Sequence, residues 1–475
     1  MMLARMRERR DRASRERALH RERSQSPTWR RMTPSGLVRP GERHGHLAST
    51  AHAQAAYPFV AQASLGSSGV LVGRNVYGGV FALDPWELYV AGLLQDPNML
   101  VLGLKGFGKS ALCKTWVFRQ RVFGRRIEVI ERKGEYGPDV EAMGGVTLRL
   151  EPGVRLNPLE RIGTRESRES LLRAVTRALL DRELSPAERV GLSAALAAVD
   201  ARCSEREVVI PDIVAELRDP SAELALELNV SQGQSRDELR ECMLALRDLS
   251  TGPLRGMFDG PTNAGDGIWE RPAVAIDISQ IARHAHGADE NTALAIALIC
   301  ATAFLDGQRH ARDRRARHTG RDPEKTVRVN DEAWRALAVP GAAEYYSSAL
   351  KLSRDSGVQY LIALHRLSDL SATGDAGSRT QQLAEGLASE AAIRVIYRQA
   401  EREAPLTADA LQLSSTERAL ITELGQGEAL WRVGERGFRV RHLIADAEWQ
   451  LVHTDEGMGA RRPQAVGGAA ASDAS

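Results

Sequence analysis

The stretch that decides the fold runs from residue 103 to residue 110 and reads Gly103-Leu-Lys-Gly-Phe-Gly-Lys-Ser110. It matches the pattern G-x-x-x-x-G-K-S, in which glycines allow backbone N–H groups to close around phosphate oxygens. The apolar run 99–102 precedes it, and the helix-compatible segment 111–120 follows it. A helix that begins there presents its positive N-terminal end to the same phosphate. This order of strand, loop and helix predicts a nucleotide-binding loop.

The side chains of the loop have distinct expected roles. Lys109 is expected to reach the β- and γ-phosphates of ATP and to act in catalysis, and Ser110 is expected to hold Mg²⁺ through its hydroxyl. The residues expected to contact the nucleotide are Gly103, Lys105, Gly106, Phe107, Gly108, Lys109, Ser110 and Ala111. We therefore expect ATP and Mg²⁺ as the ligands of this loop.

Lysine is rare in this chain, which has six lysines against fifty-eight arginines, and four of the six fall between residues 105 and 133. A compact ammonium group suits a phosphate pocket where a planar guanidinium does not fit, which accounts for Lys109. Lys105, Lys114 and Lys133 remain open to two interpretations, as parts of the pocket or as surface charges.

A second part of the site is expected at residues 327–332, a β-branched run that ends in the two acids Asp331 and Glu332. Asp331 is expected to bind Mg²⁺ through water. Glu332 is expected to polarise the attacking water as the catalytic base.

Other interpretations of this segment stay open. Arg328 and Asn330 interrupt the apolar pattern that a buried parallel strand should have. Asp277, at the end of the cleaner apolar run 274–278, is a competing metal ligand, although no glutamate follows it. A solvated Asp-Glu pair is the third interpretation, and we favour the catalytic pair over both.

Three kinds of residue are candidates for sensing the γ-phosphate. The apolar run 360–364 ends at His365, where such ATPases place a sensor, and a histidine bonded in an ordinary loop is the alternative. Arg354 is the candidate for an arginine finger that reaches a neighbouring subunit's phosphate. Arg394 and Arg398 are weaker candidates of the same kind, and a solvated position is the alternative for all three arginines.

The wider pattern predicts an α/β fold. Five further apolar runs follow the loop, at 127–130, 274–278, 327–329, 360–364 and 393–396. Because helical patterns separate them, we expect a mainly parallel sheet with helices on both faces, as in RecA-like P-loop NTPases. A capping box at 185–188 supports an all-α insertion, and a second one at 414–417 opens a late helix before a closing hairpin.

These patterns divide the chain into six predicted parts: a disordered basic tail (1–55), a small β lead-in (56–95), the first part of the ATPase domain (96–162), a helical insertion (163–260), the second part of the ATPase domain (261–456) and a disordered C-terminal tail (457–475). Both tails are poor in apolar residues. Residues 1–47 hold thirteen arginines against five acidic residues, so we expect this tail to lie near DNA or an anionic membrane surface.

Composition excludes several classes of protein. The four cysteines are widely spaced with no C-x-x-C pair, which argues against a disulfide framework or a zinc site and indicates a reducing compartment. The most apolar run, 291–305, is shorter than the ~20 residues that a bilayer requires, so we expect a buried helix there. The arginines between 309 and 321 have no interleaved aromatic residues, which favours a solvated loop.

With these pieces in order, the chain resembles the HerA/FtsK branch of P-loop motor ATPases, and within it the conjugative-transfer and type IV secretion ATPases. The resemblance covers residues 70–456 and rests on the phosphate loop and on short motifs: Glu131-Arg-Lys133-Gly134-Glu135-Tyr136, Gly144-Gly145, Leu156-Asn157-Pro158-Leu159, Phe258-Asp-Gly, Asp331-Glu332-Ala-Trp334 and His365-Arg-Leu-Ser-Asp369-Leu. Two departures are Glu131-Arg132 in place of the usual Asp-Pro, and His365 in place of the usual Gln.

The resemblance implies a homo-oligomeric ring, usually a hexamer, in which ATP lies between subunits and its hydrolysis moves DNA or a protein. It implies a cytoplasmic protein at the inner face of the cell membrane, with membrane-embedded transfer or secretion components as partners. Two alternatives remain: a duplex-DNA translocase of the FtsK type, and a nucleotide-gated scaffold that binds ATP without hydrolysing it.

Overall fold

The computed structural model describes residues 62, 65, 68–265, 267–281, 288–331, 339, 341–366, 386 and 391–452. Within these residues eleven strands form one sheet in the order β2-β1-β11-β10-β9-β3-β8-β7-β4-β6-β5. The strands are β1 (Val70–Asn75), β2 (Val80–Leu83), β3 (Met99–Leu102), β4 (Arg126–Glu131), β5 (Val146–Arg149), β6 (Ala273–Asp277), β7 (Thr326–Asp331), β8 (Val358–Leu364), β9 (Ile393–Ile396), β10 (Glu428–Val433) and β11 (Arg436–His442).

The strands from β9 to β5 in this order are parallel, so their carboxyl ends lie along one edge of the sheet. β3, which leads into the phosphate loop, lies between β8 and β9, and all four of its residues are buried. Strands covered on both faces are mostly apolar, which is why β3 and residues 360–364 of β8 read as continuous apolar runs. The predicted mainly parallel sheet is confirmed.

Two hairpins extend the sheet beyond β9 with antiparallel pairing. The predicted closing hairpin is confirmed as β10 and β11, and β10 pairs with β9. The predicted small β lead-in contains the antiparallel strands β1 and β2, and β1 pairs with β11. The N-terminal hairpin therefore belongs to the same sheet as the phosphate loop.

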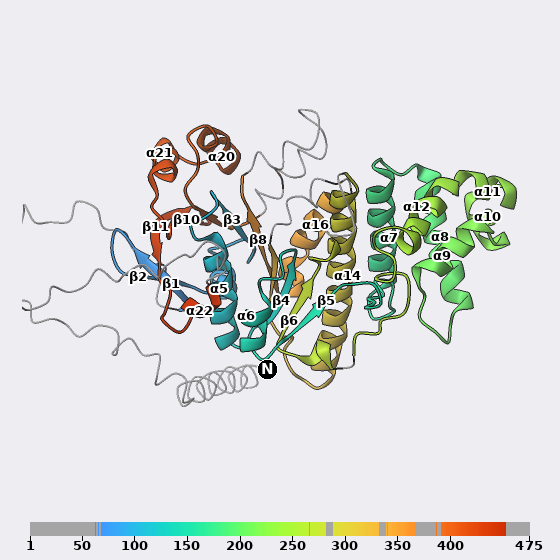
Figure 1. Cartoon of the computed structure of the whole chain (residues 1–475), viewed down its shortest axis with the longest axis horizontal. Coiled ribbons are helices and arrows are strands. Elements are labelled where there is room, and N and C mark those ends of the chain that lie inside the picture. The colour runs from blue at the N-terminus through green and yellow to red at the C-terminus, as the bar shows by residue number, and fades with distance from the viewer. Residues whose placement is uncertain are drawn as a thin grey trace, which may run out of the picture. The chain divides into compact units, whose positions relative to one another are not determined.

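Helices cover both faces of the sheet (Figure 1). The helices of the described residues are α4 (Pro85–Val90), α5 (Lys109–Val122), α6 (Gly137–Ala142), α7 (Arg165–Leu180), α8 (Pro186–Arg202), α9 (Ile210–Arg218), α10 (Ala222–Leu228), α11 (Gln232–Glu238), α12 (Arg240–Thr251), the 3-10 helix η2 (Ile268–Glu270), α14 (Ala288–His318), α16 (Ala342–Lys351), α17 (Ser353–Ser356), α20 (Ala404–Leu411), α21 (Ser415–Glu423) and α22 (Trp449–Val452).

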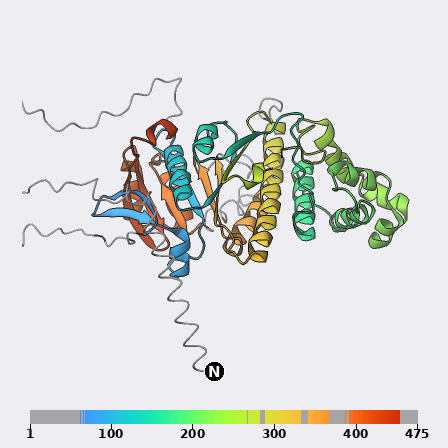
Figure 2. The same cartoon turned by 90° about the horizontal axis from the view of Figure 1, so that it is seen from below.

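Two apolar cores lie on opposite faces of the sheet, as the alternation of neighbouring residues on β3 illustrates. Val101 packs in a core with Trp116 of α5. Leu100 packs in the other core, which includes Ile296 of α14. This core continues into the group of helices α7 to α12, which lie between β5 and β6 in the sequence. Both views show α7 on the far side of α14 from the sheet (Figures 1 and 2). The capping box that begins α8, between Ser185 and Glu188, is confirmed.

The polar interruption at Arg328 on β7 is the centre of a buried charge network. Its guanidinium donates to Glu128 Oε2 on the neighbouring strand β4 at 2.6 Å, to Asp306 at 2.8 Å and to the Tyr360 hydroxyl at 3.1 Å. Arg328 and Glu128 are both fully buried. Burial alone raises the pKa of Glu128, but nearby arginines outweigh it and lower that pKa to about 2. The interruption is therefore explained by ion pairing inside the sheet.

The helix α14 corrects one prediction and confirms another. Residues 309–318, predicted as part of a solvated loop, form the last turns of this helix. Arg309 pairs with Asp313 at 2.8 Å and Arg312 pairs with Glu128 at 3.0 Å, so two of these arginines stabilise the fold. The segment Glu290–His318 is long and apolar enough to cross a membrane, but 72% of its apolar window is buried inside the protein. It is a core helix, as the run 291–305 predicts.

Candidate functional site

The phosphate loop begins where β3 ends and closes onto the first residue of α5. Gly103 has a φ of 147°, and a Cβ at this position would lie 2.5 Å from Tyr397 Cβ, so only glycine fits. Gly108 has a φ of 110° and caps α5 from the left-handed region. The two glycines allow the turn to form directly at the positive end of the helix.

Lys109 is the first residue of α5, and its side chain folds back over the loop. Its Nζ donates to the Gly103 carbonyl at 2.5 Å and to the Leu104 carbonyl at 3.0 Å. The side chain is buried. This position at a helix N-terminus agrees with the phosphate contact expected for Lys109, and the contact itself stays a prediction. Ser110 follows it, half-buried.

Asp331 lies at the carboxyl end of β7, on the same edge of the sheet as the phosphate loop and separated from β3 by β8 alone. Burial raises the pKa of the Cys113 thiol on α5, the Asp331 carboxylate raises it further, and Lys109 lowers it. The Tyr136 hydroxyl lies 3.4 Å from Asp331 Oδ2, and the neighbouring Glu135 carbonyl accepts a hydrogen bond from Lys114 of α5, so the acid lies on the α5 side of the sheet.

The competing ligand Asp277 lies farther from the loop. It ends β6, which is separated from β7 by β4. Its carboxylate is buried, pairs with Arg149 at 3.1 Å and accepts the backbone N–H of Ser279 at 2.8 Å. These contacts give Asp277 a structural role at the end of its strand, so the geometry favours Asp331.

The donor set formed by Ser110 and Asp331 fits Mg²⁺. One is a hydroxyl at the start of α5, the other is a carboxylate at the end of β7, and both are half-buried at the same edge of the sheet. Mg²⁺ keeps several waters and takes one or two protein oxygens together with substrate phosphates. Glu332, the predicted catalytic base, lies outside the described residues.

His365 follows the last residue of β8. Because Leu364 pairs with Leu102 and Ala363 pairs with Asp331, the register puts His365 between the start of the phosphate loop and the acid. That position agrees with a γ-phosphate sensor, and the role itself stays a prediction.

Arg354 lies elsewhere. It is exposed on α17, just before β8 begins, so it stands at the amino ends of the strands, away from the phosphate loop of its own chain. An arginine in this place would have to act on another subunit, and that role stays a prediction. Of the weaker candidates, Arg394 donates to the backbone of Ala391, whereas Arg398 is exposed next to the loop.

The segment 131–139 links the phosphate helix to Asp331, a role that the sequence motif alone does not reveal. Lys114 of α5 pairs with Asp139 at 2.8 Å and donates to the Glu135 carbonyl at 2.8 Å. The Tyr136 hydroxyl lies 3.4 Å from Asp331 Oδ2. Lys114 is buried, so its interpretation as a surface charge is wrong, whereas Lys105 and Lys133 are exposed.

Glu131, the first residue of this segment, holds the turn that follows it through hydrogen bonds. Its carboxylate accepts the backbone N–H groups of Glu135 at 2.6 Å and Tyr136 at 2.9 Å. Burial raises the pKa of Glu131 to about 7, the nearby Asp277 adds to the rise, and the two backbone N–H groups oppose it. The longer glutamate, in place of the usual aspartate, thus reaches two amides of the turn.

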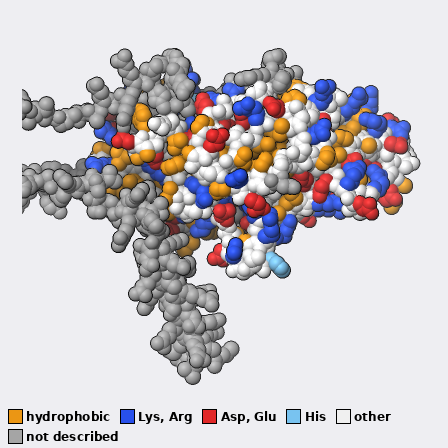
Figure 3. Space-filling model, turned by 60° about the horizontal axis from the view of Figure 1, so that its bottom comes forward, with side chains coloured by type: hydrophobic (Ala, Val, Ile, Leu, Met, Phe, Trp, Pro, Cys, Tyr) orange, Lys and Arg blue, Asp and Glu red, His pale blue; other side chains and the backbone are white. Residues whose placement is uncertain are grey.

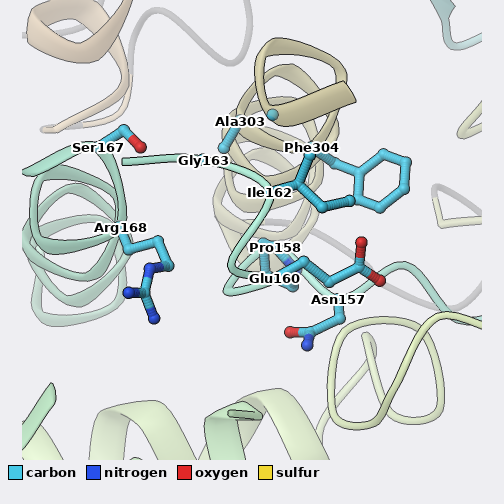
Figure 4. Close-up of a pocket in the computed structure, with 10 residues that line it drawn as sticks. Asn157, Pro158, Glu160, Ile162, Gly163, Ser167, Arg168, Ala303 and Phe304 are labelled. Carbon is cyan, nitrogen blue, oxygen red and sulfur yellow. The ribbon is translucent and has the colours of Figure 1, made fainter. Parts of the chain in front are cut away.

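The Asn157-Pro158-Leu159 motif has a structural explanation. The Asn157 side chain donates to the Val208 carbonyl at 2.9 Å and accepts the N–H of Leu159 at 3.1 Å. Figure 4 shows the motif beside a cavity of about 20 Å³ that Phe304 of α14 also lines. A cavity of this size has room for about one water molecule, so it cannot be the nucleotide site.

Comparison with solved structures finds proteins with a similar chain fold. The structure matches VirB4 of Thermoanaerobacter pseudethanolicus with a TM-score of 0.63 and 20% identity, covering 82% of this chain and 100% of that chain. It matches the bacterial conjugative coupling protein TrwBΔN70 with a TM-score of 0.49 and 15% identity, covering 73% and 84% of the two chains. TrwB in complex with ADP and Mg²⁺ matches with a TM-score of 0.48 and 14% identity, covering 73% and 86%. No protein-family model matches the sequence, and no curated protein matches it.

At 20% identity, the likeness to VirB4 shows the fold. This chain has the RecA-like P-loop NTPase fold, and its phosphate loop and Asp331 lie along one edge of the sheet. The likeness extends to the fold, and what the chain does with a nucleotide is a matter for proposal.

Proposed function

We propose that this chain is an ATP-hydrolysing motor that powers the transfer of DNA or protein through a conjugation or type IV secretion-like apparatus. One observation supports it above all: the phosphate loop with its buried Lys109 follows β3, and Asp331 ends β7 at the same edge of the parallel sheet, with β8 alone between the two strands. A triphosphate on the loop would have its charge neutralised by the helix N-terminus and Lys109, while Ser110 and Asp331 hold Mg²⁺ from the opposite side.

In this proposal the bound Mg²⁺ neutralises charge on the terminal phosphates. Glu332 orients and deprotonates the attacking water, and His365 contacts the γ-phosphate. The active form is a ring, with Arg354 of one subunit reaching the nucleotide of the next. Membrane-embedded components at the inner face of the cell membrane receive the transported chain.

The alternative of a scaffold that binds ATP without hydrolysing it gained some weight from the polar residues Arg328 and Asn330 in β7. The ion pair of Arg328 with Glu128 at 2.6 Å gives Arg328 a structural explanation and removes part of that weight. Asn330 is buried, and its carboxamide has no hydrogen-bond partner among the described residues, but it lies on the other face of β7 from Asp331. Neither Arg328 nor Asn330 occupies the position of a predicted catalytic residue.

Steady-state ATP hydrolysis by the full chain tests the proposal. Lys109→Ala and Glu332→Gln should each lower the rate at least 100-fold or so, since each removes charge stabilisation or the base. Lys351→Ala, an exposed lysine in the last turn of α16, is the matched control and should retain the wild-type rate. Rates for both catalytic variants equal to wild type would refute the enzyme assignment.

The transported substrate and the ring need a separate measurement. On the face shown in Figure 3, basic and acidic side chains are interspersed, so this surface does not point to DNA. A duplex-DNA translocase predicts ATPase activity that DNA stimulates and DNA binding that weakens steeply with salt.

Mass measurement with ATP present should give a hexamer, and removal of residues 1–47 should weaken attachment to DNA or anionic vesicles.

A further inference from the structure

The outer side of the phosphate loop is contacted by two segments from the C-terminal part of the chain. The backbone N–H of Gly427, just before β10, donates to the Phe107 carbonyl at 3.1 Å. The Gln426 side chain donates to the Gly106 carbonyl at 3.1 Å. The Arg398 carbonyl, just after β9, accepts the N–H of Leu104 at 2.9 Å. These contacts fix the loop and bring Arg398 and Gln426 to its border.

The direction of a bound nucleotide follows from the two sides of β3. Asp331 lies on the β8 and β7 side, and a cation held there by Ser110 and Asp331 would favour the most highly charged, terminal phosphates on that side. The terminal phosphates therefore face that side. The nucleoside end must extend to the opposite side of β3, which is formed by β9 and β10. That side is where Arg398 and Gln426 lie.

The side chains on this border suit a nucleobase. Arg398 is exposed, and its guanidinium lies 5.6 Å from the centroid of the Phe107 ring. A guanidinium plane stacks on aromatic faces, which a lysine ammonium does not do. Because Phe107 already orients this guanidinium, little side-chain freedom is left to lose when a base stacks on it. The exposed carboxamide of Gln426 has both a donor and an acceptor.

We propose that Arg398, backed by Phe107, is the surface on which the base of a purine nucleoside triphosphate stacks, with Gln426 at the edge of the base. The inference rests on the proposed ATPase function and adds a base-binding subsite to it. It also gives Arg398 a role within its own subunit. A purine is specified because its larger ring system offers more stacking area than a pyrimidine.

Isothermal titration of the full chain in the presence of Mg²⁺ tests this subsite, with ATP, CTP and tripolyphosphate as probes. Arg398→Ala should weaken ATP binding roughly five- to tenfold, weaken CTP binding less, and leave tripolyphosphate binding unchanged. Arg398→Lys should not restore ATP affinity, since it keeps the charge but loses the plane. Arg418→Ala, an exposed arginine on α21, is the matched control and should bind all three probes as wild type does.

The outcomes separate this inference from the proposed function. Equal losses for ATP and tripolyphosphate would mean that Arg398 contacts phosphate, and that result overturns the subsite. Unchanged ATP affinity in Arg398→Ala, together with lost affinity in Lys109→Ala, overturns the subsite and leaves the ATPase proposal standing. Activity recovered by mixing Arg398→Ala with Lys109→Ala subunits would place Arg398 in the neighbouring site and also overturn it. No ATP binding by wild type would contradict both.

Discussion

Arg328 and Asp331 stand three residues apart on β7, and they show two different uses of a charge in a buried strand. Arg328 faces the α14 side, where Glu128, Asp306 and Tyr360 all accept hydrogen bonds from it. Asp331 faces the α5 side at the end of the strand, half-buried, next to the Tyr136 hydroxyl and the phosphate helix. The two residues therefore differ in position: Arg328 is inside the strand and bonded within the core, whereas Asp331 ends the strand at the edge of the sheet where the phosphate loop lies.

The largest expected effect comes from breaking the buried network. Arg328→Met leaves the fully buried Glu128 with fewer partners, so the free energy of unfolding should fall by about 3–5 kcal/mol. Urea unfolding monitored by circular dichroism measures this.

The companion variant at Asp331 sharpens the contrast. Asp331→Asn should change the free energy of unfolding by less than about 1 kcal/mol, because the residue is half-buried at a strand end. If Asp331→Asn unfolded as easily as Arg328→Met, the division between structural and functional charge would be wrong.

A smaller effect is expected at Glu131, a buried carboxylate whose charge state affects the free energy of unfolding. Its pKa of about 7 in the folded protein exceeds its ordinary value of 4.5, so the folded chain binds the extra proton between these values. Its contribution to stability is therefore full below about pH 4.5 and is lost as the pH rises through 7. Glu131→Gln should remove about 2 kcal/mol of this pH dependence.

Urea unfolding of wild type and Glu131→Gln at pH 5 and pH 8 isolates that contribution, because all other titrating groups are shared. Wild type should lose stability relative to the variant as the pH rises. Parallel pH profiles for the two proteins would show that the pKa of Glu131 is not raised.

The smallest effect is expected at Tyr136. Tyr136→Phe removes the hydroxyl 3.4 Å from Asp331 and keeps the ring that lies 5.3 Å from Lys114 Nζ. A hydrogen bond of this length is weak, so kcat for ATP should fall about threefold with KM unchanged. Tyr346→Phe is the control, since its buried hydroxyl bonds Thr302 and should affect stability alone. Equal kcat losses in both variants would deny Tyr136 a positioning role.

The parts predicted from sequence are those with a local cause. The phosphate loop, the helix after it and the capping box at Ser185 depend on neighbouring residues, so spacing alone predicted them. The strands were found because strands covered on both faces must be apolar. The position of Asp331 at the end of β7 was predicted in the same way, and its role stays a prediction.

The parts that were not predicted depend on contacts between distant residues. Arg309 and Arg312 were predicted to be solvated because nothing in the sequence identifies Asp313 and Glu128 as their partners. Lys114 gave no sign that it would bind the turn at Glu135. The union of the first hairpin with β11 joins residues more than 350 positions apart, which no local pattern reports.

The most direct test of the account is the Mg²⁺ dependence of ATP binding, measured by titration calorimetry on wild type, Lys109→Ala and Asp331→Asn. The account predicts that wild type binds ATP more tightly with Mg²⁺, that Asp331→Asn keeps only the Mg²⁺-independent affinity, and that Lys109→Ala loses both. If Asp331→Asn gained as much affinity from Mg²⁺ as wild type does, the metal would not be held between the phosphate loop and β7, and the central claim would be contradicted.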